Sequence, residues 1–251
     1  AHYASSTLSN LSWQAKMSAN SQQQQWVRNI AMSYVFAFPL AADLQTKIDN
    51  MLSGHAKGEY VDAKVSTDLA IGTTDGVTKA LALDVIEILK SNGEGAGLLG
   101  VLANLLKSTM HVLIRQIMGK VDHSEQDKLA GYLKNRRIEV NGSPRFGFVM
   151  PDALGARFDE LLTRIAGGNL VNARPDITKA MQDFVAVAVT SFYDEFTSCI
   201  DLGFVKRKMV DVGRGTIIKG SQSTVNKLFA TMSDEDLQKV TAHYATMFVK
   251  Q

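Results

Sequence analysis

The sequence is poor in cysteine, with Cys199 alone among 251 residues. One cysteine cannot form an intramolecular disulfide, and it excludes zinc sites built from several thiolates. Cys199 falls on the apolar face of a predicted helix, where cysteine behaves as a small hydrophobic residue with an unreactive thiol. No Gly-x-Ser-x-Gly motif supplies a serine nucleophile in its place. The sequence therefore offers no nucleophile for covalent catalysis.

Proline and net charge are also low. Four prolines leave long stretches free to form helix. Lysine and arginine total 27 against 25 aspartates and glutamates, so the net charge is +2 and we expect no nucleic-acid partner. Hydrophobic residues make up 45% of the chain, which is typical of a globular protein. The chain as given shows no signal-peptide pattern, and we expect a soluble protein whose compartment the sequence does not define.

Signatures of metal and cofactor sites are missing as well. No histidine belongs to a His-x-x-x-His or Glu-x-x-His motif, the usual helical arrangements of zinc and di-iron ligands. Residues 212–221 share with a phosphate-binding loop only the spacing of Gly215 and Gly220, because no lysine follows the second glycine. We therefore expect no metal and no cofactor. The histidines are His2, His55, His111, His123 and His243.

The longest apolar stretch runs from Gly95 to Lys120, and we expect the fold to be organised around it. As a helix, about 22 of its residues would extend roughly 33 Å, which is long enough to cross a bilayer. Lys107 and Arg115 argue against a membrane span, because each charge at membrane depth costs about 2.5–3.5 kcal/mol. We expect a helix buried at the centre of the domain, with one narrow polar stripe. The stripe consists of Asn104, Ser108, His111 and Arg115.

A second apolar helix is predicted over Val77–Leu89, capped at residue 74 or 75 and joined to the first by a short turn. The two helices should form an antiparallel hairpin that brings Asp84 and Glu87 opposite the polar stripe. Two interpretations of this seam remain open. It is either a structural ion-pair network or solvated edge, or a polar channel in which His111 transfers protons.

Local signals predict several other elements. Pro39 should end or kink a helix near Phe38. Residues Ser53–Thr74 have lost the helical period and are expected to form a long connection that contains one short strand. Asn141-Gly142, between two β-prone runs, predicts a small β-hairpin.

The C-terminal half is predicted to continue as helices. Pro151 and Pro175 should each open a helix, and Ser233 should cap the last one. Glycines within residues 205–232 predict two short helices there rather than one. The expected fold class is all-α, a single multi-helix domain over residues 1–251, orthogonal or bundle-like, with the hairpin inserted around Asn141. Residues 1–20 are expected to form a loosely packed arm.

The expected function is binding rather than catalysis, through a protein partner or through self-association into a homo-oligomer. The support is the missing catalytic and cofactor motifs. A first alternative is a protein that binds an apolar ligand or acts on a membrane, because the helices over Val77–Leu89 and Leu98–Met118 are so hydrophobic. A second alternative is an enzyme with a site along the His111 stripe, covered by the Ser53–Thr74 connection. The candidate binding residues are those of the seam, Asn104, Ser108, His111, Arg115, Asp84 and Glu87.

Overall fold

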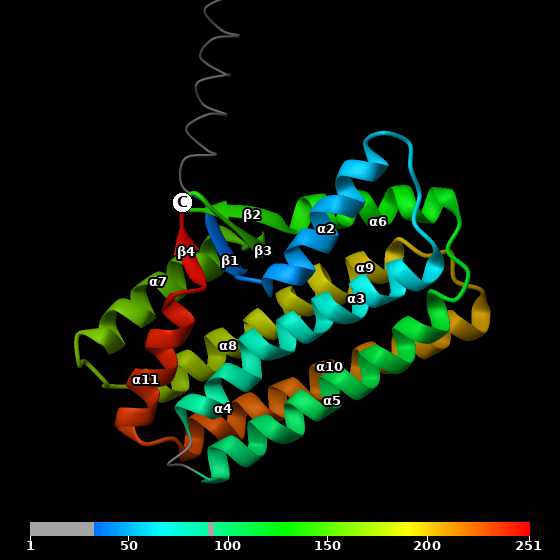
Figure 1. The fold of residues 1–251 in the computed structure, drawn as a ribbon. Coiled ribbons are helices and arrows are strands. Elements are labelled where there is room, and N and C mark those ends of the chain that lie inside the picture. The colour runs from blue at the N-terminus through cyan, green and yellow to red at the C-terminus, as the bar shows by residue number, and fades with distance from the viewer. Residues whose placement is uncertain (1–32, 90–92) are drawn as a thin grey trace, which may run out of the picture.

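The computed structural model describes residues 33–89 and 93–251 (Figure 1). The protein is mostly helical, with a small antiparallel sheet at one end. The all-α expectation therefore holds in its coarse form, although the sheet is larger than the predicted hairpin. The predicted arm over residues 1–20 lies outside the described residues.

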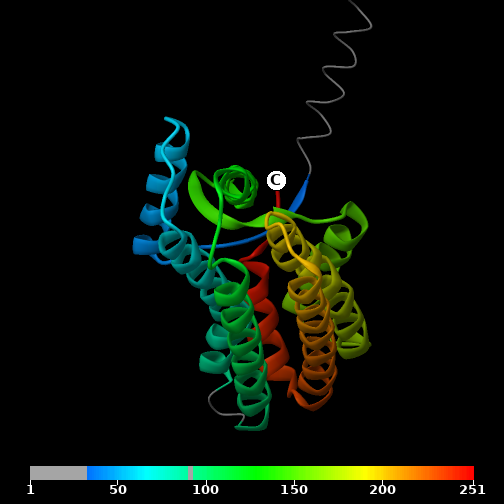
Figure 2. The same ribbon diagram turned by 90° about the vertical axis from the view of Figure 1, so that its right-hand side faces the viewer.

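Four long helical segments lie side by side below the sheet and form a bundle (Figure 1, Figure 2). The first of these segments packs against the second, the second against the fourth, and the fourth against the third. Two of the segments contain a π-helical turn. In chain order, the segments are α3 (Ala63–Thr78) with η1 (Lys79–Leu83) and α4 (Asp84–Ile88); α5 (Gly93–Ile117); α8 (Ala173–Val189) with η2 (Thr190–Asp194) and α9 (Glu195–Ser198); and α10 (Phe204–Thr231).

Shorter helices cover the bundle. Beside the sheet, α2 (Ala42–His55) packs against α6 (His123–Arg136), while α7 (Asp152–Ala166) packs against both α8 and α11 (Asp234–Ala245). The predicted helix starts near Pro151 and Ser233 are confirmed. The Ser233 hydroxyl accepts a hydrogen bond from the Asp236 N–H at 3.1 Å, as an N-cap serine does.

The sheet has the strand order β2-β3-β1-β4 and is antiparallel throughout. The predicted hairpin is confirmed, because β2 and β3 are joined by Asn141 and Gly142, both with the positive φ that a type I′ turn requires. The hairpin does not protrude, since β1 pairs with β3 and β4 pairs with β1. The strands are β1 (Tyr34–Phe38), β2 (Arg137–Val140), β3 (Ser143–Val149) and β4 (Phe248–Lys250).

Strand β1 shows that the prediction of a helix ending at Phe38 is wrong. Phe36 pairs with Phe148 across the β1–β3 ladder, and the Phe36 side chain is fully buried against α8. Gly147 permits this close pairing, because a Cβ there would lie 1.9 Å from the Phe36 carbonyl oxygen. The apolar run that resembles a helix is a strand because its partner lies far along the chain, where a local pattern cannot show it.

The expected connection over Ser53–Thr74 is also wrong, since most of it is helix and the structure, which describes all of it, places no strand there. Asp62 caps α3 by accepting a hydrogen bond from the Val65 N–H at 2.8 Å. The helix then runs through residues 74 and 75 instead of starting there. Its threonines obscure the helical period, but the Thr74 hydroxyl donates to the Ala70 carbonyl at 3.0 Å, so this hydroxyl has a partner within the helix.

Residues 204–231 form one helix, α10, rather than two short ones. Two of the glycines that suggest a break in the helix lie where α10 contacts neighbouring helices. A Cβ on Gly220 would lie 2.2 Å from the Leu105 Cδ2, and one on Gly213 would lie 2.7 Å from the Tyr193 hydroxyl. These glycines therefore let α10 approach α5 and η2 closely. Packing against these neighbours maintains the helix at residues whose intrinsic helix propensity is low.

Candidate functional site

The predicted polar stripe lies on the outer face of α5. Asn104, Ser108 and Arg115 are exposed, and His111 is half-buried. The expectation of a centrally buried helix is therefore wrong, because only 33% of the residues in the most apolar part of α5 are buried. By length and composition alone, α5 is the one described helix that is apolar enough to cross a membrane.

In the structure, His111 of the polar stripe pairs with Asp75 rather than with Asp84 or Glu87. Asp75 lies 3.0 Å from the His111 Nε2 and 3.6 Å from the Lys107 Nζ, measured from its Oδ1. Asp84 forms an ion pair with Lys79 of its own helical segment. The reason is the unexpected length of α3, which places residue 75, rather than the later acidic residues, beside the second half of α5. Glu87 lies beyond Asp84, in α4. A catalytic or binding role for these residues stays a prediction.

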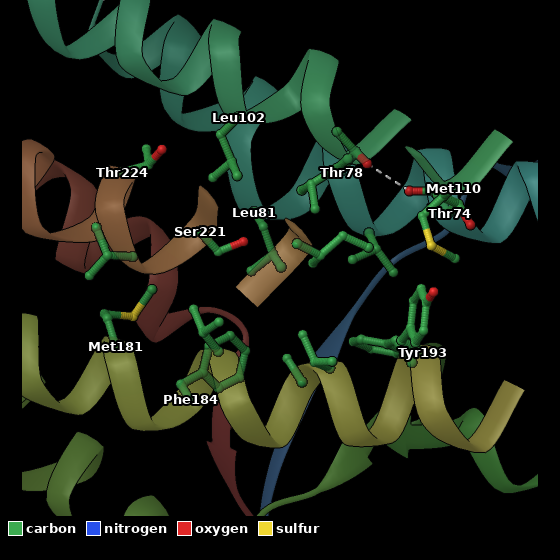
Figure 3. Close-up of a pocket in the computed structure, with 18 of the residues that line it drawn as sticks. Thr74, Thr78, Leu81, Leu102, Met110, Met181, Phe184, Tyr193, Ser221 and Thr224 are labelled. Carbon is green, nitrogen blue, oxygen red and sulfur yellow. Dashed lines mark hydrogen bonds between the residues drawn. The ribbon is translucent and has the colours of Figure 1, made fainter. Parts of the chain in front are cut away.

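A cavity of about 120 Å³ lies inside the bundle (Figure 3). Its wall is formed mainly by α3, α5, α8 and α10, with both π-helical turns, and is completed by Tyr132 of α6, Phe146 of β3 and Tyr244 of α11. Its surface is mainly aliphatic and aromatic, with a few hydroxyl groups. The lining residues labelled in Figure 3 are Thr74, Thr78, Leu81, Leu102, Met110, Met181, Phe184, Tyr193, Ser221 and Thr224.

Six hydroxyl groups in the wall are already used by the protein, those of Thr73, Thr74, Thr78, Tyr132, Tyr193 and Tyr244. Thr74 donates to the Ala70 carbonyl at 3.0 Å, and Thr78 donates to the Thr74 carbonyl at 2.9 Å. The Tyr193 hydroxyl donates to the Val210 carbonyl at 2.6 Å. Each of these bonds stays within the protein, so each donor is satisfied before any ligand enters.

Ser221 and Thr224 differ from the other hydroxyl residues. Both are more than nine-tenths buried, with exposed fractions of 7% and 8%. Both line the cavity, and no hydrogen bond joins either hydroxyl to another residue of 33–89 or 93–251. Figure 3 shows the Ser221 hydroxyl pointing from α10 into the space above α8. These two groups are the polar atoms of the wall that are available to a bound molecule.

The electrostatic character of the cavity is neutral. None of the described residues that line it is charged, and none is a histidine. Burial raises the pKa of Tyr193 and of Tyr244 well above the usual range, so both phenols stay protonated at ordinary pH. An ion that entered would lose its hydration without gaining a counter-ion, which is strongly unfavourable.

The two π-helical turns lie on helices that border the cavity. Leu81 enters the wall from η1, while Phe192 and Tyr193 enter it from η2. A π turn inserts one extra residue into a helix and thereby rotates the side chains that follow it, and such turns are frequent at functional sites. Neither segment contains glycine or proline, so no local residue pattern indicates a π turn in either place.

A smaller chamber of about 20 Å³ adjoins the cavity. Ala70, Thr73, Tyr132 and Phe196 border both spaces. Ser66 lines the small chamber, is 4% exposed, and has a buried hydroxyl without a hydrogen-bond partner. The chamber is large enough for one water molecule, which needs about 10–15 Å³.

Reactive groups are scarce elsewhere in the described part of the chain. No group of three or more His, Cys, Asp or Glu side chains in residues 33–89 and 93–251 could hold a metal ion. Cys199 is buried, and burial raises the pKa of its thiol to about 11, so it is protonated and unreactive at neutral pH.

The residues of the cavity are not identified by the sequence patterns. They come from the four long helical segments and from α6, β3 and α11, and each segment alone shows only an apolar face. The available signal is the presence of Ser221 and Thr224 on the buried side of a helix, where hydroxyl residues need a partner. Comparison with known proteins finds no matching family model, curated protein or solved structure.

Proposed function

We propose that the protein binds a small apolar molecule in the cavity between α3, α5, α8 and α10. The observation that supports this function is the cavity itself, about 120 Å³ of space inside the core. Protein cores pack almost as densely as organic crystals, and few of their voids exceed a water molecule. At about 24 cal/mol per Å³, a void of this size costs roughly 3 kcal/mol of stability. A bound apolar molecule would restore those lost contacts.

The volume limits the size of the ligand. An engineered cavity of about 150 Å³ in another protein binds benzene, so this one suits a molecule of about six non-hydrogen atoms. Met110 and Met181 line the wall, and the flexible methionine side chain can adjust to somewhat larger shapes. The proposal therefore concerns small hydrocarbons and their simple derivatives, not long lipids.

Benzene binding tests the proposal. Saturating benzene should raise the melting temperature of the wild-type protein, because a ligand that binds only the folded state stabilises it. Ala188→Leu places extra carbon atoms in the cavity wall and should abolish most of this increase. Ala156→Leu, at an exposed position on α7, is the matched control and should keep it. If benzene leaves the wild-type melting temperature unchanged and shows no heat of binding, the proposal is wrong.

Association through the outer face of α5 is a second candidate function. Val101 and Val112 are 69% and 53% exposed and fall on the same face of the helix, together with Ser108. An apolar helix that is only one-third buried favours a protein partner or a second copy of the chain as its cover.

Sedimentation velocity tests this second candidate. If copies of the chain pair through α5, Val101→Glu should shift the protein to the monomer at concentrations where the wild type is a dimer. Val171→Glu is the matched control, because Val171 is 73% exposed but lies outside α5. A wild-type protein that is monomeric at every concentration removes self-association and leaves only a different protein as the partner.

A further inference from the structure

We propose that the molecule bound in the cavity carries one neutral hydrogen-bonding group, a hydroxyl or a carbonyl, and that Ser221 and Thr224 bind this group. This inference rests on the proposed function and specifies its ligand class. The ligand is therefore a small alcohol, aldehyde, ketone or phenol rather than a pure hydrocarbon or an organic acid.

The position of the two hydroxyls is the first support. Residues three apart on a helix share a face, so Ser221 and Thr224 both stand on the side of α10 that lines the cavity. The Ser221 hydroxyl points into the space between α10 and α8 (Figure 3). One polar group on a ligand can therefore contact this face of α10 while the rest of the molecule meets the apolar wall around Leu81 and Phe184.

The energy of an unpaired hydroxyl is the second support. Leaving a buried polar group without a hydrogen bond costs about 1–3 kcal/mol. Threonines elsewhere in the wall avoid this cost by donating to a carbonyl of their own helix, as Thr78 does to Thr74. Ser221 and Thr224 make no such bond to any of the described residues, and their oxygens face the cavity space rather than being fully enclosed, so an apolar molecule that filled the cavity without a polar group would impose this cost. A ligand oxygen would provide the missing partner.

The absence of charge in the wall is the third support. A carboxylate bound beside Ser221 would have no cation among the described lining residues. Two hydroxyl donors do not compensate an anion for its lost hydration in such an apolar space. A hydroxyl or carbonyl group needs only one or two hydrogen bonds, which these residues can supply.

Three probes of similar size separate the explanations, namely n-hexane, 1-pentanol and pentanoate. Binding is followed by NMR of protein labelled with ¹³C at the methionine methyl groups. Met110 and Met181 line the cavity and should respond to bound probes, whereas Met150 lies outside it and serves as the reference signal. For the wild-type protein we expect shifts with n-hexane and with 1-pentanol, and none with pentanoate.

Ser221→Ala removes a hydroxyl without adding bulk. We expect it to weaken 1-pentanol binding by a factor of about 2–10, the value of a neutral hydrogen bond, while n-hexane binds as well as before. Thr224→Val should act in the same direction. Thr78→Val is the matched control, because it removes a cavity hydroxyl that already donates to the Thr74 carbonyl, and it should leave the ratio of the two affinities unchanged.

The outcomes distinguish this inference from the function on which it rests. If n-hexane binds but Ser221→Ala and Thr224→Val leave the ratio of 1-pentanol to n-hexane affinity at the wild-type value, the hydroxyl-recognition inference is overturned and apolar binding stands. Pentanoate binding as tightly as 1-pentanol would overturn the requirement for a neutral group. If neither n-hexane nor 1-pentanol shifts the Met110 and Met181 signals, the proposed function fails and the inference fails with it.

Discussion

At the residue scale, Asp127 of α6 holds the short connection between α2 and α3. Its Oδ1 lies 2.8 Å from the His55 Nε2 and accepts a hydrogen bond from the Tyr60 hydroxyl at 3.1 Å. Tyr60 in turn stacks on His123, with 3.9 Å between the ring centroids. Hydrogen bonding, first from His55 and then from Tyr60, holds the pKa of Asp127 below its usual range.

This lowered pKa predicts a pH-dependent effect of Asp127→Asn. A carboxyl group with a lower pKa in the folded state stabilises the fold above its ordinary value of 3.8, and the contribution is lost as the pH falls through the folded pKa. The variant should therefore melt at a lower temperature than the wild type at pH 6, and the difference should shrink toward pH 2. Asp159→Asn, on an exposed aspartate of α7, is the matched control for the change from aspartate to asparagine. An equal deficit for Asp127→Asn at both pH values would contradict the assignment.

Residue-level chemistry is only partly predictable from the sequence. The positive φ at Asn141 and Gly142 follows from the dipeptide itself, because few other residues suit a type I′ turn. The acidic partner of His111 does not follow, because the helical register depends on where α3 begins. A one-turn error in a helix start changes which carboxylate faces a given side chain.

At the element scale, α10 shows why glycine is ambiguous in a sequence. A Cβ on Gly215 would have no side-chain or distant backbone atom within 4 Å, whereas a Cβ on Gly220 would meet Leu105. Gly215 thus only lowers the helix propensity of α10, whereas Gly220 allows the close contact with Leu105. The local pattern predicts two short helices because it cannot distinguish these roles.

Alanine substitutions in α10 distinguish a continuous helix from a broken one. Gly215→Ala should raise the free energy of unfolding by about 0.5–1 kcal/mol, because alanine is the better helix former and nothing obstructs it. Gly220→Ala should be less stable than Gly215→Ala, since Leu105 must move by rotating its side chain. Urea denaturation measures both values. Destabilisation by Gly215→Ala would indicate a turn at that position, as the local sequence pattern suggests.

At the scale of the whole molecule, the sheet joins three segments that are distant in sequence. Strand β1 lies between β3 and β4, so the middle and the end of the chain both pair with residues 34–38. The cavity depends on the same long-range assembly, because its wall combines four helical segments with side chains from α6, β3 and α11. Neither feature is encoded in any local stretch, which is why the sequence predicts individual helices and the β2–β3 hairpin but misses the pairing of β1 with β3 and β4, and the site.

Phe248 tests whether β4 belongs to the cooperative core. Its ring stacks on Phe158 of α7 at 4.1 Å and meets Phe184 of α8 edge-on at 5.0 Å, so one side chain joins the last strand to two helices. Phe248→Ala should lower the free energy of unfolding by about 2–4 kcal/mol, somewhat less than for a fully buried phenylalanine because Phe248 is only partly buried.

Phe204→Ala is the matched control for this substitution, since Phe204 is 72% exposed at the start of α10, and the same change in chemistry should cost less than about 0.5 kcal/mol there. Urea unfolding followed by both circular dichroism and tyrosine fluorescence should give one transition for each protein. If Phe248→Ala unfolds with the wild-type midpoint, β4 is an appendage rather than part of the core. A single lowered midpoint by both probes would instead show that the last strand stabilises the bundle that encloses the cavity, because the aromatic contacts of Phe248 are then part of the same folding unit.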